Sequence, residues 1–211
     1  MRTVRPPFFF RWLSPEYLVC DVPGSERDIY LTFDDGPIPE ATPEVLDILM
    51  RYNAKATFFM VGDNARKYPE LLARVKGEGH AIGNHTFHHL NGWHIAPGAY
   101  LEDVMHCSEY VQSNLFRPPY GRFTPSQYFL LKKNYRFILW SVLTWDFDRR
   151  TSPDQCLKNA IENTTGGSVV VFHDSIKSLE NVRYALPAYL EHFINQGYTF
   201  KTLDWNQRQM I

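Results

Sequence analysis

The stretch IYLTFDDGP, residues 29–37, places two adjacent acidic residues, Asp34 and Asp35, at the end of an apolar strand. Carboxylates beside buried apolar surface are costly unless a positive group neutralises them, and a metal ion is the candidate that the chemistry favours. Side chains alternate along a strand, so the two carboxylates are expected to point in opposite directions, one binding a cation and the other handling protons. Asp-Asp-Gly is also common in plain surface turns, so the pair alone leaves both interpretations open.

A second stretch, GNHTFHH at residues 83–89, contains two histidines with a metal-ligand spacing. This spacing would place the imidazoles of His85 and His89 on one face of a helical turn, within reach of one ion. The alternative is a polar loop in which several of the chain's eight histidines cluster. Together with Asp35, the two histidines predict a divalent metal site. Three protein ligands leave coordination positions open for water and substrate, as a catalytic site requires.

Further motifs follow in a fixed order along the chain. The set comprises TFDDG at residues 32–36, HTFHH at residues 85–89, RPPYG at residues 117–121 and VFH at residues 171–173. These segments resemble the motifs of the polysaccharide deacetylases with a NodB-homology domain, also called carbohydrate esterase family four; Val171 stands where that family usually has leucine. The resemblance extends from about Asp28 to about Leu203, which is nearly the whole chain.

The segment LTWDF at residues 143–147 departs from the pattern of the same family, which is Asp-x-x-Asp-Trp after a strand. Leu143 replaces the first acid and Phe147 replaces the tryptophan. Asp146 remains and could orient or tune a catalytic histidine, and Asp148 is a second candidate for the same work. The sequence leaves open which aspartate acts and whether turnover is reduced.

Apolar runs and helical patterns alternate along the chain, which indicates an α/β fold. Strands are predicted at residues 29–33, 56–61, 81–83, 115–117, 137–142, 168–172 and 198–203. Helix starts are predicted at Thr42 and Ser152, each an N-cap followed by proline, and residues 181–195 form another amphipathic stretch. About seven parallel strands suggest a distorted, incomplete (β/α) barrel, in which the motif residues share the face at the carboxyl ends of the strands.

Residue chemistry and the family resemblance together assign roles in the hydrolysis of an acetyl group. Asp35, His85 and His89 are expected to hold a divalent ion. Asp34 is expected to take a proton from the attacking water. His173 is expected to protonate the leaving amine, the alternative being a core histidine that ends an apolar strand. The ligand set suits Zn²⁺ and also accepts Co²⁺, Ni²⁺ or Mn²⁺.

Three more residues complete the expected catalytic set. Arg117 is expected to keep Asp34 ionised through two hydrogen bonds, the alternative being a surface arginine before a proline-rich turn. Asp146 is expected to assist the catalytic histidine. By resemblance, the backbone N–H of Tyr120 stabilises the oxyanion. Its neighbours Pro119 and Gly121 belong to the same substrate-binding loop.

Aromatic side chains near the motifs suggest how a sugar is bound. Trp93 and Trp145 are predicted to stack on sugar faces, whereas Trp140, within an apolar run, is predicted to pack in the core. The predicted function is removal of N-acetyl groups from an N-acetylated glycan such as peptidoglycan or a chitin-like oligomer. Two alternatives stay open, namely an O-acetyl esterase acting on an acetylated polysaccharide and a carbohydrate-binding protein with impaired turnover.

Composition agrees with one enzyme-sized domain. The 211 residues are 44% hydrophobic and 15% aromatic, enough for a sizeable core. We expect a deacetylase domain at residues 28–205, with an N-terminal segment, residues 1–27, that packs on it. A net charge of −1 without a basic run gives no electrostatic footprint for nucleic acid. Three scattered cysteines support no disulfide framework, and the oligomeric state is left open.

The sequence also gives expectations about membranes. No stretch approaches the roughly 20 apolar residues of a transmembrane segment. There is no recognisable signal peptide, because Arg11 ends the apolar run Phe8-Phe9-Phe10. A cytoplasmic location is therefore expected. Membrane-peripheral contact through residues 8–13 is the alternative to these aromatics capping the fold.

Overall fold

The computed structural model describes residue 4 and residues 18–203. The strands of this part of the chain are β1 (Leu18–Val19), β2 (Asp28–Asp34), β3 (Thr57–Met60), β4 (Ala81–Asn84), β5 (Leu115–Phe116), β6 (Arg136–Ile138), β7 (Val142–Leu143), β8 (Val169–His173) and β9 (Thr199–Phe200). The α-helices are α1 (Thr42–Arg51), α2 (Gly62–Lys67), α3 (Pro69–Gly77), α4 (Pro97–Ser108), α5 (Pro125–Leu131), α6 (Pro153–Asn163) and α7 (Leu179–Asn195). Two short 3-10 helices are η2 (Gly92–His94) and η3 (Pro119–Gly121).

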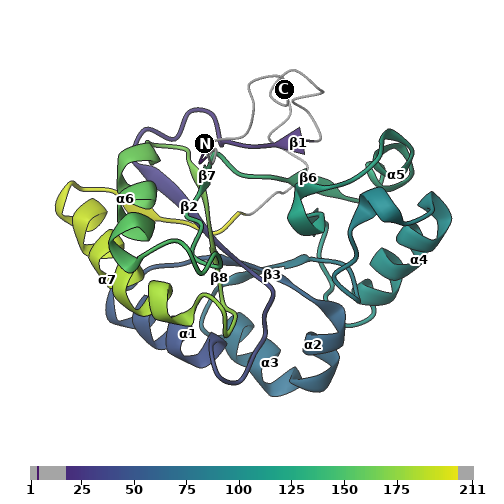
Figure 1. Ribbon diagram of the computed structural model, residues 1–211, viewed down its shortest axis with the longest axis horizontal. Coiled ribbons are helices and arrows are strands. Elements are labelled where there is room, and N and C mark those ends of the chain that lie inside the picture. The colour runs from purple at the N-terminus through teal and green to yellow at the C-terminus, as the bar shows by residue number, and fades with distance from the viewer. Residues whose placement is uncertain (1–3, 5–17, 204–211) are drawn as a thin grey trace.

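The strands form one curled sheet with helices around its outer side (Figure 1). Their order is β1-β6-β5-β4-β3-β2-β8-β7, all neighbours pair in parallel, and β9 pairs with β2 outside this path. Within the described residues the end strands β1 and β7 are not paired with each other, so the barrel is incomplete. The predicted distorted (β/α) barrel is thus confirmed.

Strand β2 is an interior strand of the sheet and sets the register of the site. It pairs with β3 on one side and with β8 on the other, and the latter ladder runs from Tyr30 opposite Val169 to Asp34 opposite His173. The predicted strand at residues 29–33 is therefore extended by one residue at each end, and its last residue is the first acid of the motif.

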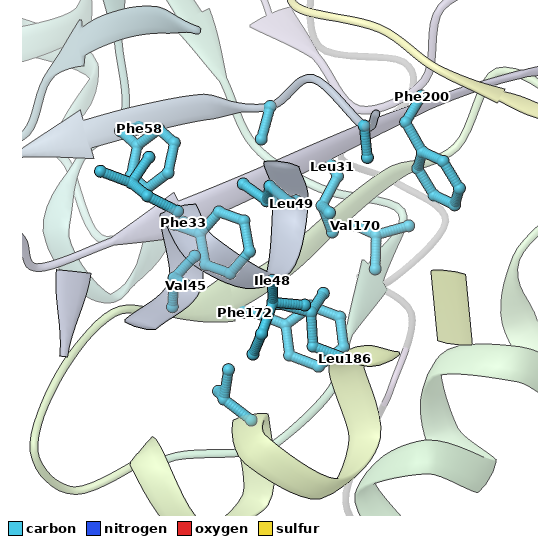
Figure 2. Packing of buried hydrophobic residues seen from close by; sticks show 14 of the residues in the cluster. Leu31, Phe33, Val45, Ile48, Leu49, Phe58, Val170, Phe172, Leu186 and Phe200 are labelled. Carbon is cyan, nitrogen blue, oxygen red and sulfur yellow. The ribbon is translucent and has the colours of Figure 1, made fainter. Parts of the chain in front are cut away.

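A large apolar core lies between the sheet and the helices. Phe33 of β2 stacks on Phe58 of β3 with ring centroids 5.1 Å apart, and Val45 and Leu49 of α1 lie beside them (Figure 2). Each of these side chains is almost fully removed from water. Burial of this size fixes β2 firmly, so the residues that follow it start from a rigid position.

One predicted strand is wrong. Residues 137–142 form two strands instead of one: β6 pairs with β5 and β1, whereas β7 pairs with β8 at the other end of the sheet order. Between Ile138 and Val142 the chain crosses from one end of the sheet order to the other, with the Leu139 N–H bonded to Val19 and the Ser141 N–H bonded to Val169. Trp140 lies in this crossing and packs against a core cluster, as predicted. Strand β1 was not predicted, because a two-residue strand gives no periodic signal.

The two predicted helix starts have different outcomes. Ser152 caps α6 as predicted, accepting a hydrogen bond from Gln155 N at 3.2 Å. Thr42 is not the N-cap of α1: the cap is Ala41, which makes no side-chain bond, and Thr42 is the first helical residue. Its hydroxyl instead donates to Asp174 Oδ2 at 2.6 Å and accepts the Ile38 backbone N–H at 2.7 Å, so this buried side chain satisfies two polar groups outside the helix.

The described residues answer some of the remaining expectations. Cys20, Cys107 and Cys156 are buried and form no disulfide with one another, in agreement with the absence of a disulfide framework. No helix among residues 18–203 is both long and apolar enough to cross a membrane. Residues 8–13 lie outside the described part, and the proposed domain limits at residues 27 and 205 stay predictions.

Candidate active site

Motif residues from distant parts of the sequence meet at the carboxyl ends of the strands. Asp34 and His173 are the last residues of β2 and β8 and lie opposite each other in the sheet. His85 directly follows β4, Arg117 directly follows β5, and Asp146 follows β7 by three residues. The predicted convergence on one face is therefore present.

Asp35, His85 and His89 form a candidate cation site. Their ligand atoms all lie within 4.8 Å of one another, and Asp35 Oδ1 is 3.2 Å from His89 Nε2 and 3.9 Å from His85 Nε2. The Nδ1 atom of His85 is 2.7 Å from the backbone oxygen of Arg117, to which it donates its proton. The Nε2 lone pair of His85 then faces the carboxylate, as ligation of a divalent ion requires.

The electrostatics of these groups also suit a cation. Burial lowers the pKa of His85 to about 4, so its imidazole is neutral and able to ligate at neutral pH. Burial raises the pKa of Asp35, but the hydrogen bond from His89 and the nearby histidine charges outweigh it and hold that pKa well below its usual range. The Asp35 carboxylate and the neutral imidazole of His85 therefore face a common point, which His89 also faces.

Arg117 is fully buried and contacts Asp34. Its Nη1 donates to Asp34 Oδ1 at 2.6 Å and to Thr32 Oγ1 at 2.8 Å, and the guanidinium lies 4.1 Å from the centre of the Phe59 ring. The remaining donors bond the backbone oxygens of Ile138 and Leu139. The expected pairing is correct, but the expectation of two hydrogen bonds to the carboxylate is wrong, because the other donors must satisfy backbone oxygens of the crossing segment.

His173 and Asp146 form a second pair of opposite charge. The Asp146 carboxylate is fully buried, accepts the His173 backbone N–H at 2.6 Å and lies 2.8 Å from His173 Nδ1. Burial lowers the pKa of His173, but Asp146, followed by Asp35 and Asp34, outweighs it and raises the pKa to about 9. We call Asp34–Arg117 and His173–Asp146 the strand-end pairs.

The aspartate that the sequence left undecided is thereby located. Asp146 contacts the histidine, whereas Asp148 pairs with the exposed Arg150 at 2.9 Å. Phe147 packs edge-on against the His173 ring, with centroids 4.7 Å apart. The altered fourth motif therefore retains a carboxylate on His173 Nδ1, and an aromatic ring still covers that imidazole.

Comparison with known proteins identifies the family. Residues 21–136, more than half of the chain, match the model of the polysaccharide deacetylases. A peptidoglycan-N-acetylglucosamine deacetylase of Bacillus cereus is 34% identical over 197 residues, which cover 89% of this chain and 91% of that protein. The chain belongs to the polysaccharide deacetylase family.

Two further relatives are similar over most of this deacetylase. A chitooligosaccharide deacetylase of Azorhizobium caulinodans is 32% identical over 188 residues, covering 78% of this chain and 89% of that protein. The crystal structure of the Bc1960 peptidoglycan N-acetylglucosamine deacetylase superposes with a TM-score of 0.85 at 33% identity, covering 92% and 94% of the two chains. The family and the fold named by the motif resemblance are both confirmed.

The histidine loop of this deacetylase, residues 85–90, is not a helical turn. Thr86 and His89 adopt the left-handed conformation, with φ of 61° and 55°, and the Thr86 hydroxyl accepts the backbone N–H of Leu90 at 3.1 Å. Asp35 likewise has a φ of 86°, so the strict alternation expected for Asp34 and Asp35 does not apply. The histidines meet as predicted, but a strained loop rather than a helix brings them together.

Asp103 of α4 holds the histidine loop and was missed by the sequence reasoning. Its buried Oδ2 accepts the backbone N–H groups of Phe87 at 2.7 Å and His88 at 3.1 Å, and Oδ1 contacts the His88 ring. The available signal was an acidic residue directly before Val104, on the buried side of an amphipathic helix. A carboxylate in that position needs donors from a neighbouring segment.

Asp174, next to the predicted acid, was also missed. It is buried, its Oδ1 accepts the Gly36 N–H at 3.0 Å and its Oδ2 accepts the Thr42 hydroxyl. Burial raises its pKa to about 8. The end of β8 therefore places His173 in the site, and the next residue, Asp174, anchors the loop that carries Asp35.

The predicted sugar-contact residues lie in two separate groups. Tyr120, 59% exposed, places its ring 4.8 Å from the ring of His89, and Trp93 is equally exposed. Trp145 lies on the other side, half-buried, with its ring 5.4 Å from Phe147. The first group follows strands β4 and β5, and the second group follows β7. These strands lie on opposite sides of β2 in the sheet order.

The loop of η3 supports Tyr120. Pro119 is buried, Tyr120 has a φ of 61°, and Gly121 has a φ of 65°. A Cβ at Gly121 would lie 2.7 Å from the Trp140 ring, so a larger residue does not fit. This packing holds the loop that places the Tyr120 ring beside His89.

Proposed function

We propose that this protein is a divalent-metal-dependent deacetylase that hydrolyses N-acetyl groups on N-acetylglucosamine residues of a glycan such as peptidoglycan or chitooligosaccharide. The observation that carries the proposal is the pairing of one candidate cation site with two differently tuned strand-end pairs. One pair holds a carboxylate beside a fixed arginine, and the other holds a histidine beside a buried carboxylate. Acyl hydrolysis needs such a base and such an acid.

The residues divide the work by their chemistry. A divalent ion on Asp35, His85 and His89 would supply Lewis acidity toward the acetyl carbonyl and a water molecule. We assign Zn²⁺ to this site, with Co²⁺, Ni²⁺ and Mn²⁺ as ions that the same donors accept. Asp34 takes the proton from the attacking water, and Arg117 orients this carboxylate through its charged hydrogen bond.

The acid side follows from the second strand-end pair. His173 gives a proton to the leaving amine, and its raised pKa keeps the imidazole protonated at neutral pH. Asp146 fixes the orientation of the ring through Nδ1, which leaves Nε2 to deliver the proton. The backbone N–H of Tyr120 is assigned to the developing oxyanion.

The protonated His173 favours an amide substrate over an ester substrate. An alkoxide leaves more readily than an amide nitrogen, so a histidine kept protonated by a buried carboxylate is of greatest use for C–N cleavage. Loss of turnover is not favoured, because the strand-end pairs keep Asp34, Arg117 and Asp146 in costly buried positions that sugar binding does not need.

Acetate release tests this proposal. Protein stripped with a chelator and reloaded with Zn²⁺ or Co²⁺ is incubated with N-acetylglucosamine oligomers, peptidoglycan and acetylated xylan. We expect metal-dependent release from the N-acetylated glycans that falls by at least about 10²-fold in Asp34→Asn and in His173→Ala. Release from acetylated xylan alone would favour the esterase, and tight ion and glycan binding without release would favour the binding protein.

A further inference from the structure

Arg122 and Trp93 form a stacked pair at the edge of the candidate active site. The Arg122 guanidinium carbon lies 4.6 Å from the centre of the Trp93 ring. Trp93 belongs to η2 in the segment that follows the histidine loop, and Arg122 directly follows η3. The pair therefore joins the two segments that contribute His89 and Tyr120 to the site.

The position of the pair is fixed by buried contacts. The side chain of Gln127, fully buried, donates to the backbone oxygens of Gly92 at 2.8 Å and Ile95 at 3.0 Å. A Cβ at Gly92 would lie 2.5 Å from the backbone oxygen of Arg122, so the two segments touch at the backbone. Trp93 is 59% exposed on this rigid support. An exposed indole in such a fixed position is typical of a binding surface.

The charge of Arg122 is not neutralised by a carboxylate within the described part of the chain. Its side-chain contact there is the Trp93 ring. By contrast, Arg74, Arg117, Arg150 and Arg183 each form an ion pair with an acidic side chain. A stacked guanidinium keeps its N–H edge open, and that edge matches a carboxylate with two parallel hydrogen bonds.

The pair is carried by the same two segments as His89 and Tyr120 of the candidate active site. The Tyr120 ring lies 4.8 Å from the ring of His89, and Arg122 follows Tyr120 by two residues. Arg122 covers one face of the Trp93 indole, which leaves the opposite face for a sugar ring. An apolar ring face and a cationic edge therefore lie together on the segments that also carry His89 and Tyr120.

We propose that Arg122 and Trp93 form a subsite for a sugar that carries a carboxylate, next to the N-acetylglucosamine residue that is deacetylated. Trp93 binds the sugar ring, and Arg122 binds the carboxylate. The preferred substrate is then an acidic N-acetylated glycan, such as peptidoglycan with its lactyl and stem-peptide carboxylates, and not a neutral oligomer. This inference rests on the proposed deacetylase function and adds the substrate class.

Two matched substrates test the subsite. One is a peptidoglycan-derived oligosaccharide with free carboxylates, and the other is the same oligosaccharide with its carboxylates converted to amides. We expect Arg122→Gln to raise KM for the acidic substrate about tenfold, the effect of losing one charged hydrogen-bonding partner, with kcat unchanged. KM for the amidated substrate should stay the same, and Arg122→Lys should restore part of the difference.

Further variants separate the two members of the pair. Trp93→Ala should raise KM for the acidic and the amidated substrate alike, because both present the same sugar face. Arg183→Gln, an arginine on α7 paired with Glu44, serves as the control for loss of a surface charge. Equal changes of KM for both substrates in Arg122→Gln, or no change, would overturn the carboxylate subsite.

Calorimetric binding makes the result independent of turnover. The acidic and amidated oligosaccharides are titrated into metal-loaded wild type and into Arg122→Gln. A preference for the acidic form that disappears in Arg122→Gln supports the subsite even when no acetate is released, which would refute only the deacetylase function. Equal binding of both forms by the wild type would refute the subsite even when deacetylation is intact.

Discussion

The strand-end pairs and the histidine loop hold reactive side chains by different means. Asp34 and His173 are placed by the register of β2 and β8, and each contacts a buried partner of opposite charge. The histidine loop lies beyond the end of β4, and it combines left-handed residues and backbone hydrogen bonds to Met60, Gly62 and Asp63 with the carboxylate of Asp103. Changes in a strand-end pair should therefore affect the whole fold, whereas changes beneath the loop should affect ion binding.

The largest effect is expected from breaking a strand-end pair. Arg117→Leu leaves the Asp34 carboxylate buried without its partner and removes the donors to the crossing segment. We expect the free energy of unfolding in urea to fall by about 3 kcal/mol. Arg183→Leu, which removes an exposed ion pair with Glu44, is the control and should change it little. Equal effects of the two variants would show that the buried pair is not a stability determinant.

The next effect tests the histidine loop. Asp103→Ala removes the acceptor of the Phe87 and His88 N–H groups and frees the loop. Affinity for Zn²⁺, measured by calorimetric titration of chelator-stripped protein, should fall about 10- to 100-fold, as when an outer partner of a metal ligand is lost. Asp103→Asn keeps one acceptor oxygen and should lose less. Wild-type affinity in Asp103→Ala would mean that the loop is held without this carboxylate.

A smaller effect distinguishes charge from geometry within a strand-end pair. His173 must be protonated to act as the acid, so activity should be lost as pH rises through its pKa. Because the Asp146 charge raises that pKa, Asp146→Asn should shift the basic limb of the kcat/KM profile to lower pH by about one unit or more. A basic limb that stays at the wild-type pH would assign it to another group.

The smallest effect is expected at the altered fourth motif. Leu143→Asp restores the acid of the family pattern, but His173 Nδ1 already faces Asp146. We expect kcat/KM on N-acetylglucosamine oligomers to rise less than about twofold, because Asp146 already accepts the hydrogen bond of the single Nδ1 of His173. A large increase would show that Leu143 limits proton transfer. Leu143→Asn, of similar size and uncharged, separates charge from polarity.

The sequence predicted best where burial and pairing act over a whole strand. Strand β2 was found within one residue at each end, because a continuous apolar run between polar neighbours has few other solutions. The convergence of Asp34, Arg117 and His173 followed directly from parallel topology. The split of residues 137–142 was missed, because apolar side chains face the core equally in one long strand and in two short ones joined by a crossing segment.

The sequence predicted the reactive side chains of the site more completely than the residues that hold them in place. Asp103 and Asp174 act on backbone N–H groups of segments distant in sequence, and no local spacing encodes such a contact. The helical turn expected for His85 and His89 was wrong, because a four-residue spacing also fits a loop that contains left-handed residues. The divided interaction of Arg117 was missed because the backbone oxygens that it satisfies belong to the unpredicted crossing.

Gly36 and Asp174 share one small volume beside the candidate cation site. A Cβ at Gly36 would lie 1.9 Å from Asp174 Oδ2, closer than any real contact. A larger residue at position 36 therefore requires a smaller one at position 174, and that replacement removes the acceptor of the Gly36 N–H and of the Thr42 hydroxyl. In any redesign of this deacetylase, the first motif and the residue after the proposed acid must be exchanged as one unit.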